Sequence, residues 1–251
     1  MSFKMFTIIT VCRNAESTIE DTLKSVSFEK NTEHLEYCVV DGMSTDGTRD
    51  VIDQYRSIVD HLIVEKDANM YEAINKGIAA SSGEVIAVLN ADDYYKPGAL
   101  SRIRMAYEES HKVDIVHAGM ERVDASGDIV SYQAPPAKAR LARRMPFHHP
   151  AMFVKREVYQ VLGLYDTRFN SAADYDFAIR VCKSHFSTYA LNDPITCFRV
   201  GGQSEAHWLP PVKQLIAIFS KNRIPWHESM FLIMRRVMAR YVHYCVLRKK
   251  T

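Results

Sequence analysis

Residues 86–95 read IAVLNADDYY, an apolar run that ends abruptly in an amide and two adjacent carboxylates. A short run of this kind is typical of a strand buried on both faces. Neighbouring carboxylates repel each other and gain nothing from apolar surroundings, so a cation is expected where Asn90, Asp92 and Asp93 follow the strand. Mg²⁺ and Mn²⁺ bind through one or two carboxylates and complete their shells with water and substrate phosphates. The stretch therefore predicts a divalent-cation site; the alternative is an ordinary strand-end turn before a helix that starts near Pro97.

The first hundred residues around this stretch alternate between strand and helix patterns. Strands are predicted at residues 5–12, 35–41, 61–65 and 84–90, and helices at 17–26, from about 46–48 to 58, and at 69–81. Ser17 and Glu20 have the spacing of a capping box at the start of the first helix. Units this short imply parallel strands with right-handed crossovers, and such sheets bind ligands beyond the carboxyl ends of the strands. We therefore expect the polar groups after the four strands to converge: Arg13–Asn14, Asp41 to Asp46, Asp67 and Asn90 to Asp93.

The second half of the chain is less regular. Strands are predicted at 113–123 and 127–134, a strand followed by a helix at 148–163, a helix at 172–184, and two separate strands at 186–192 and 194–200. A glycine-led loop at 201–211 has the composition of a segment that can open and close. His148 and His149 precede a buried strand, and His207 and Trp208 lie in the loop. For all four, a structural role and a substrate contact stay open as interpretations.

Composition places the chain among ordinary globular proteins. Its 251 residues are 47% apolar and 25% charged, which suits one large α/β domain or two small ones. The five cysteines are scattered and form no C-x-x-C pair, so neither a disulfide framework nor a zinc site is predicted, and a reducing cytosol fits. We expect no secretory signal and no membrane-spanning helix.

Charge is distributed unevenly along the chain although the net charge is only +2. Residues 1–100 carry 9 Lys and Arg against 17 Asp and Glu, whereas residues 221–251 carry 8 against one Glu. In the predicted helix at 226–250, Arg236, Arg240 and His243 share one face among apolar residues. This helix either packs on the domain or lies on an anionic bilayer; we favour the bilayer, and a nucleic-acid partner is not expected.

Seven stretches together resemble the inverting glycosyltransferase family 2, whose nucleotide-binding fold is called GT-A. They are TIITVCRNA (7–15), VVDGMSTDGT (39–48), EKDANMYEAINKGI (65–78), VLNADD (88–93), FVKREVYQVLGLYDTRF (153–169), SAADYDFAIR (171–180) and FRVGGQS (198–204). They span roughly residues 5–204 in the family's order, and the third further resembles the subgroup that builds bacterial surface polysaccharides. The resemblance implies a Rossmann-like, mostly parallel α/β sheet flanked by helices, with a C-terminal acceptor-side part and a C-terminal amphipathic helix.

The resemblance also implies roles for individual residues. Those implied to contact the nucleotide sugar are Thr10, Cys12, Arg13, Asp41, Ser44, Asp67, Asn75, Lys76, Asn90 and Ala91. Asp41 would accept a hydrogen bond from the base. Asn90 to Asp92 match the family's D-x-D motif with Asn in place of the first Asp. Asp92, together with Asp93, would hold Mn²⁺ or Mg²⁺.

Asp174 falls where the family keeps its general base, although Ala173 replaces the usual Glu and Asp176 is a competing carboxylate. Both acids also suit the first turn of a helix, where a negative charge is favoured. In the implied reaction, Asp174 removes the proton of an acceptor hydroxyl as that hydroxyl displaces a metal-bound diphosphate with inversion.

The sequence thus predicts a metal-assisted inverting glycosyltransferase that uses a UDP-sugar and a saccharide acceptor on a polyprenyl diphosphate lipid. Residues 1–210 would form the GT-A domain, with a nucleotide half at 1–100 and an acceptor half at 101–210, and residues 211–251 a basic extension. The protein would be cytoplasmic and peripheral on the inner face of a bacterial cytoplasmic membrane. The alternative is a non-catalytic scaffold that binds a sugar nucleotide. A sugar-nucleotide pyrophosphorylase would need a glycine-rich loop after the first strand, and a dinucleotide oxidoreductase would need a G-x-G-x-x-G motif after a strand. The sequence contains neither, so neither enzyme is expected.

Overall fold

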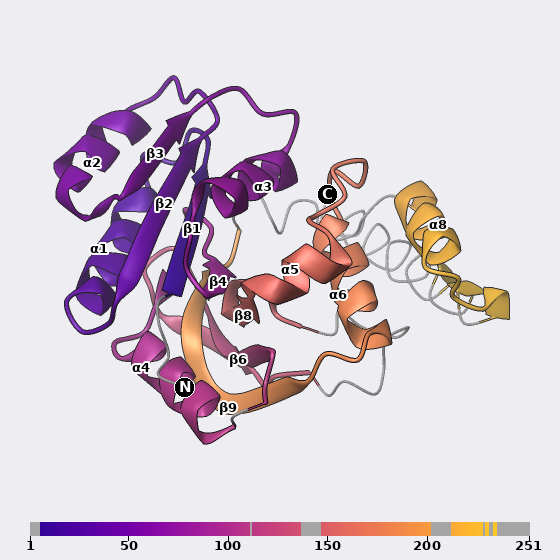
Figure 1. The fold of residues 1–251 in the computed structure, drawn as a ribbon. Helices are drawn as coiled ribbons and strands as arrows, with labels where there is room; N and C mark the ends of the chain where they lie inside the picture. The colour runs from indigo at the N-terminus through magenta and orange to yellow at the C-terminus, as the bar shows by residue number, and fades with distance from the viewer. Residues whose placement is uncertain are drawn as a thin grey trace.

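The computed structural model describes residues 6–110, 112–136, 147–201, 212–227, 229–230 and 233–234, which form an α/β structure around one mixed sheet (Figure 1). The strand order is β3-β2-β1-β4-β8-β6-β9-β5, and β7 pairs with β6. Most of the predicted helix at 226–250 lies outside the described residues, as do His207 and Trp208. Within the described ranges, no helix is long and apolar enough to cross a membrane.

The first four strands of the sheet confirm the predicted parallel arrangement. They are β1 (Phe6–Cys12), β2 (Leu35–Asp41), β3 (His61–Val64) and β4 (Val85–Val88), with β1 between β2 and β4. The register sets Cys12 opposite Asp41, so both strands end at the same edge. β1, β2 and β4 are buried at every position, because helices cover both faces of the sheet.

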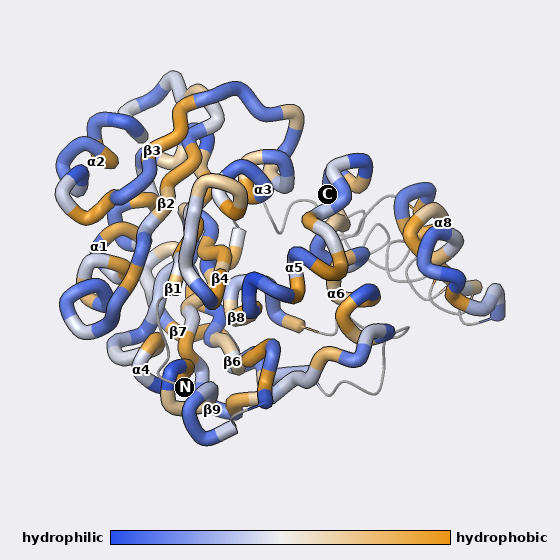
Figure 2. Tube along the Cα trace, in the orientation of Figure 1, coloured by the Kyte–Doolittle hydropathy of each residue, from blue (hydrophilic) through white to orange (hydrophobic). Residues whose placement is uncertain are grey.

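Alternate residues of each strand point to the two faces, and each face has its own core. One face packs α1 (Ile19–Lys30) and α2 (Thr48–Gln54), which a 3₁₀ turn at Arg56–Ile58 follows, and the other packs α3 (Met70–Ala80). Figure 2 shows hydrophobic residues along the central strands and hydrophilic ones on the outer turns of α1 and α2. Two buried layers of this kind hold the strand ends rigidly in place.

Antiparallel pairs enter the sheet in the second half of the chain. β8 (Met152–Lys155) lies between β4 and β6 (Ile115–Val123) and is antiparallel to both. β6 also pairs with β7 (Ile129–Gln133) and, in parallel, with β9 (Thr188–Arg199), which in turn pairs with β5 (Tyr94–Tyr95). A single sheet therefore contains strands from both halves of the chain, from β1 to β9.

Two separate strands were predicted where the structure has the single strand β9. The register with β6 shifts beside Gly119, which is opposite Pro194, and the strand continues beyond this point. Proline cannot donate a ladder hydrogen bond, so it is accommodated at an irregularity instead of ending the strand.

The predicted capping box at the start of α1 is wrong. The helix begins at Ile19 after Thr18, no side chain caps it, and Glu20 pairs with Lys24 at 2.9 Å. The α4 helix (Ala99–Glu109) is capped instead by a residue distant in sequence: the buried Glu29 carboxylate accepts from the N–H groups of Gly98 at 2.7 Å and Leu100 at 2.9 Å.

The remaining α-helices in the described ranges are α5 (Arg156–Leu162), α6 (Ala173–Lys183) and α8 (Val212–Lys221). They belong to the α3 side of the sheet, where Val158, Phe177 and Leu215 join the same core as Ile74. Asp174, the predicted general base, lies in the first turn of α6. The shared core therefore brings Asp174 toward α3.

Candidate active site

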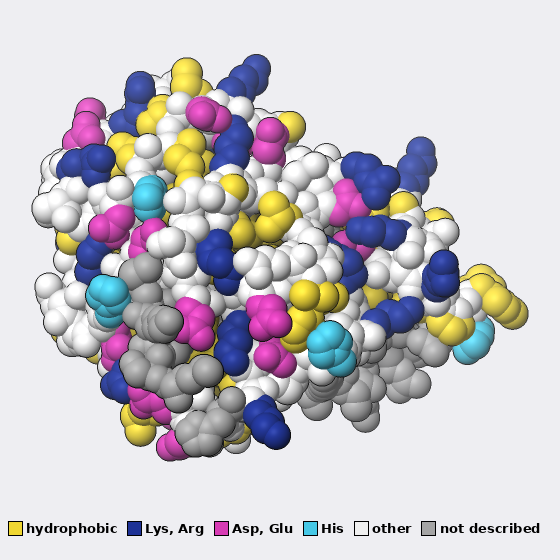
Figure 3. Space-filling view, in the orientation of Figure 1, with side chains coloured by type: hydrophobic (Ala, Val, Ile, Leu, Met, Phe, Trp, Pro, Cys, Tyr) yellow, Lys and Arg dark blue, Asp and Glu magenta, His cyan; other side chains and the backbone are white. Residues whose placement is uncertain are grey.

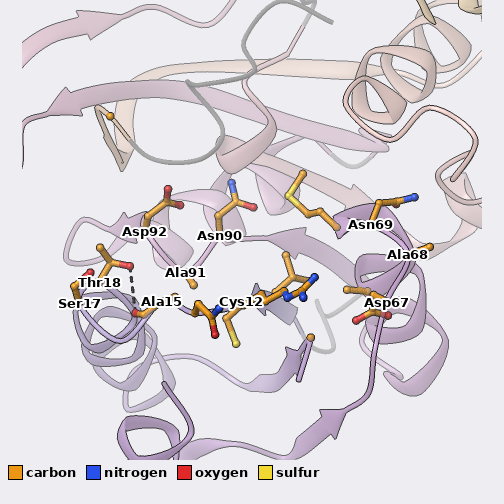
Figure 4. A pocket seen from close by; sticks show the side chains of 17 residues that line it. Cys12, Ala15, Ser17, Thr18, Asp67, Ala68, Asn69, Asn90, Ala91 and Asp92 are labelled. Atoms are coloured by element: carbon orange, nitrogen blue, oxygen red, sulfur yellow. Dashed lines mark hydrogen bonds between the residues drawn. The ribbon is translucent and has the colours of Figure 1, made fainter. Parts of the chain in front are cut away.

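A cavity of about 510 Å³ opens at the carboxyl ends of the first four strands (Figure 4). Its walls come from Cys12 at the end of β1, Arg13 after β1, Gly42 after β2, Asp67 after β3 and Asn90 to Asp92 after β4. The segment that leads into α1, the start of α3 and Gly201 also line it. The four strand ends therefore meet at one cavity, as predicted, but the β2 end contributes Gly42 instead of its polar side chains.

Asp92 offers an open carboxylate on one wall of the cavity. No described residue donates a hydrogen bond to it apart from its own backbone N–H. Burial raises the pKa of Asp92, while that N–H and the charge of Arg199 act in the opposite direction. Nearby, the buried Oδ1 of Asn90 has no hydrogen-bond donor among the described residues. An unpaired amide oxygen and a partly exposed carboxylate thus both follow β4.

Asp93, the second predicted metal ligand, does not line the cavity. It is fully buried, and its carboxyl accepts from the N–H of Arg199 at 3.2 Å and from Nδ2 of Asn90 at 3.2 Å. Burial and the neighbouring Asp92 charge raise the pKa of Asp93 well above its ordinary value. Its position indicates that it anchors the turn after β4 to β9.

The donor set that faces the cavity fits a hard divalent cation with few protein ligands. Within the described ranges, no three His, Cys, Asp or Glu side chains gather into a complete metal cage. Asp92 with the unpaired amide oxygen of Asn90 suits Mg²⁺ or Mn²⁺, which take the rest of their shell from water and substrate phosphates. On this geometry Asp92, and not Asp93, would hold such an ion.

The opposite end of the cavity is formed by Asp67, which Figure 4 shows across from Asp92. Lys76 lies 2.8 Å from the Asp67 carboxylate and 2.8 Å from that of Glu65, and these two acids raise the pKa of the lysine. Lys76 itself does not line the cavity. Its contact with the donor therefore stays a prediction, and its described role is to neutralise Asp67.

Thr10, Asp41 and Ser44 lie beneath the cavity and do not reach its surface. Thr10 accepts from the Tyr37 hydroxyl at 2.9 Å inside the sheet. Asp41 accepts from both the N–H and the hydroxyl of Ser44, and burial next to Asp41 raises the pKa of the Cys12 thiol. The proposed contact of Asp41 with a base stays a prediction, because its oxygens are engaged in shaping the turn after β2.

Two asparagines line the cavity: Asn14 was expected among the converging polar groups, whereas Asn69 was not singled out as a site residue. Asn14 has a left-handed φ of 52°, and its side-chain oxygen accepts from the N–H of Thr45 at 2.9 Å. Asn69 caps α3 by accepting from the N–H groups of Tyr71 and Glu72 at 3.0 and 3.2 Å. Asparagine tolerates left-handed backbone and favours N-cap positions, so both roles were detectable from residue type.

Asp174 stands at the first turn of α6, outside the cavity lining. Its Oδ1 accepts from the Tyr71 hydroxyl at 2.8 Å and from the N–H of Tyr175 at 2.8 Å. Its Oδ2 accepts from no described residue. Tyr71 follows Met70, which lines the cavity, so Asp174 is joined to the cavity wall through one residue of α3.

Asp176, the competing carboxylate, is fully buried and engaged by three groups. Arg180 and Lys221 each lie 2.9 Å from one oxygen, and Asn222 donates to the other at 2.8 Å. Neither oxygen of Asp176 is therefore free to take a proton from an acceptor hydroxyl. The geometry favours Asp174 over Asp176 as a base and gives Asp176 the role of attaching α8 to α6.

Asn75 faces the second half of the chain instead of the cavity. Its side chain donates to the Tyr165 carbonyl at 2.8 Å and accepts from the Tyr165 N–H at 3.1 Å. His149 hydrogen-bonds the Tyr165 hydroxyl at 3.2 Å, and His148 the Ala134 carbonyl at 3.0 Å. Burial lowers the pKa of both histidines. The contacts of these three residues are structural.

The fold and site define an enzyme of the GT-A class: a parallel nucleotide-binding half, an oxygen-rich cavity at its strand ends, and a carboxylate on an adjoining helix. Residues 7–162 match the family described as Glycosyl transferase family 2. The chain belongs to that family and is a glycosyltransferase.

Curated relatives agree with this assignment. The chain is 27% identical over 190 residues to a PGL/p-HBAD biosynthesis glycosyltransferase of Mycobacterium tuberculosis. The aligned region covers 72% of this chain and 70% of that relative. It is 36% identical over 101 residues to the putative teichuronic acid biosynthesis glycosyltransferase TuaG of Bacillus subtilis, covering 39% and 40% of the two chains.

Two solved structures share the fold at low sequence identity. TarS residues 1–349 of S. aureus, in complex with UDP-GlcNAc, superposes with a TM-score of 0.67 at 19% identity, covering 86% of this chain and 65% of TarS. The mannosyltransferase PcManGT of Pyrobaculum calidifontis, in complex with GDP-Man and Mn²⁺, gives 0.68 at 18%, covering 94% and 75%. The predicted GT-A fold is confirmed.

Proposed function

We propose that the chain transfers a sugar, with inversion, from a UDP-sugar to a hydroxyl of a lipid-linked saccharide during surface polysaccharide synthesis. The observation that carries the proposal is the cavity at the four strand ends, with the open carboxylate of Asp92 on one wall and Asp174 joined to its rim through Tyr71. The polymer class rests on the relatives, since TuaG is named for teichuronic acid biosynthesis.

The donor would occupy the cavity with its diphosphate near Asp92. TarS supports a UDP-sugar because it was solved with UDP-GlcNAc, and PcManGT supports a divalent ion because it was solved with Mn²⁺. A divalent ion held by Asp92 would neutralise the diphosphate as it leaves. Arg13, exposed at the cavity wall, adds a positive charge for the same anionic ligand.

The chain's own contribution to the chemistry would be proton removal. As the acceptor oxygen forms its bond to the anomeric carbon, its proton passes to Asp174, and the nucleoside diphosphate leaves with the electron pair of the broken bond. Oδ2 of Asp174 is the atom free to take that proton, because Oδ1 already accepts two hydrogen bonds. A positioned base of this kind contributes about 10²–10⁴ in rate.

The first test is calorimetric binding of UDP, GDP and dTDP, with and without Mn²⁺. Metal-supported binding of UDP that is lost in Asp92→Ala but kept in Asp53→Ala is expected, because Asp53 is an exposed acid of α2 far from the cavity lining. Equal affinity with and without metal would contradict the role of Asp92. Binding without any release of UDP from UDP-sugars would favour the non-catalytic scaffold.

The acceptor side of the proposal places the C-terminal region on an anionic membrane. The described residues there leave Ile216, Trp226, Met230 and Met234 between 49% and 72% exposed. Figure 3 shows hydrophobic side chains and Lys or Arg gathered at the end of the molecule where α8 lies. Exposed apolar groups beside cations are the combination that binds the headgroup region of anionic bilayers.

Sedimentation with lipid vesicles tests this membrane contact. The protein should pellet with vesicles that contain phosphatidylglycerol and stay in solution with pure phosphatidylcholine. Trp226→Ala should weaken pelleting severalfold, because Trp226 is the most exposed large apolar residue among those described. Equal pelleting with both vesicle types would count against an anionic surface.

A further inference from the structure

The helix α3 contacts both the donor cavity and the second half of the chain. Its first turn contributes Asn69 and Met70 to the cavity lining. Asn69 also donates through Nδ2 to the Thr167 carbonyl at 3.0 Å, and Asn75 holds the backbone of Tyr165 from two turns further on. The helix is therefore fastened on either side of Tyr71 to the segment that leads into α6.

Tyr71 occupies the centre of this contact. Its ring stacks on that of Tyr165 with centroids 5.7 Å apart, and its hydroxyl donates to Oδ1 of Asp174 at 2.8 Å. The side chain is only 3% exposed, so water does not replace this donor. Burial, and next the charge of Asp174, raise the pKa of Tyr71 well above its ordinary value, so the hydroxyl stays protonated as a donor.

We propose that Tyr71 is a positioning residue for Asp174: its hydroxyl fixes the carboxylate so that Oδ2 is presented to the acceptor hydroxyl. The inference deepens the proposed function and rests on Asp174 as the base. Two hydrogen bonds to Oδ1 restrict rotation of the carboxylate about its Cβ–Cγ bond. A base held within a narrow range of orientations needs no reorganisation when the acceptor arrives.

Tyr71→Phe removes the donor to Oδ1 of Asp174 but keeps the aromatic ring that stacks on Tyr165. The turnover rate should therefore fall while the affinity for UDP is kept. A residue with only a packing role would not separate the turnover rate from the UDP affinity in this way.

The chain contains a matched control in Tyr159. Its hydroxyl lies 3.3 Å from that of Tyr165, its ring stacks on Phe177 at 4.8 Å, and it belongs to the same core as Tyr71. It makes no contact with Asp174. Tyr159→Phe removes an equally buried hydroxyl from the same aromatic cluster while leaving the base untouched.

The experiment measures release of UDP from UDP-GlcNAc and other UDP-hexoses by the full chain with Mn²⁺, with water as the acceptor. Tyr71→Phe should lower kcat roughly 10-fold or more, since hydrogen bonds to charged groups are the stronger kind. Its UDP affinity should stay within about twofold of wild type, because the hydroxyl does not line the cavity. Tyr159→Phe should keep both the turnover rate and the UDP affinity.

A double-mutant cycle separates positioning from general damage. Once Asp174→Asn has removed the base, adding Tyr71→Phe should lower the rate no further. The proposal is overturned if Tyr71→Phe behaves like Tyr159→Phe, or if it costs the same factor in the Asp174→Asn background. If the wild-type chain does not bind UDP, the proposed function itself fails. If Asp174→Asn keeps full activity, Asp174 is not the base, and both the proposed function and the role of Tyr71 are contradicted.

Discussion

The end of β4 and the start of α6 each present two acidic residues close together, and the structure treats the two members of each pair differently. Asp93 and Asp176 are fully buried and bonded to neighbours, whereas Asp92 and Asp174 keep oxygen atoms open. The inner acid of each pair joins distant segments, β9 in one case and α8 in the other. Burial, and not residue type, thus decides which acid is available for chemistry.

The largest loss of activity is expected from a change at Asp174. Asp174→Asn keeps the size of the side chain and its acceptor for Tyr71, yet it cannot take a proton at neutral pH. The turnover rate should fall by roughly 10²–10⁴ while UDP affinity is kept. Steady-state kinetics with calorimetry on the same samples measures both. In contrast, Asp176→Asn should keep the activity of each folded molecule within about threefold, and a larger loss there would reverse the assignment.

A smaller effect, on stability, is expected at Asp176. Asp176→Ala leaves Arg180, Lys221 and Asn222 without their shared acceptor, so the free energy of unfolding should fall by about 3 kcal/mol. Urea titration followed by circular dichroism measures this loss. Asp166→Ala is the matched control, because Asp166 also pairs with Lys221 but its other partner, Arg168, is 75% exposed. That change should cost about 1 kcal/mol at most, and an equal loss at both sites would show that burial is not the deciding factor.

The parts of the fold that follow from local pattern were predictable from the sequence. The four parallel strands, their polar ends and the helix at 172–184 all depend on periodicity and on residues adjacent in the chain. The capping box failed because the helix has Thr18 and not Ser17 at its N-cap, so Glu20 does not stand three residues after the cap and pairs with Lys24 instead. The continuity of β9 was missed because Pro194 resembles a strand end until its neighbour Gly119 is known.

The site was predicted in its location but less well in its individual contacts. The convergence of Arg13, Asp67 and Asp92 needs only the rule that parallel strands end at one edge. Whether a side chain lines the cavity or points behind it depends on tertiary contacts, which the sequence does not show. Asp93 was therefore predicted to bind the metal and Asn75 to contact the nucleotide sugar, although neither lines the cavity. The contact between Tyr71 and Asp174 was not predicted, because nothing in the local sequence of Tyr71 indicates a partner 103 residues away.

The pairing of the Asn75 amide with both the N–H and the C=O of Tyr165 has a consequence for protein engineering. An Asp at this position could not donate to the carbonyl, a Leu could do neither, and a Gln would be one methylene too long for the same two distances. Libraries aimed at a new donor sugar should therefore keep Asn75 constant, although the motif suggests it as a sugar contact. Diversity is better placed at Ala68 and Met70, which line the cavity and are exposed.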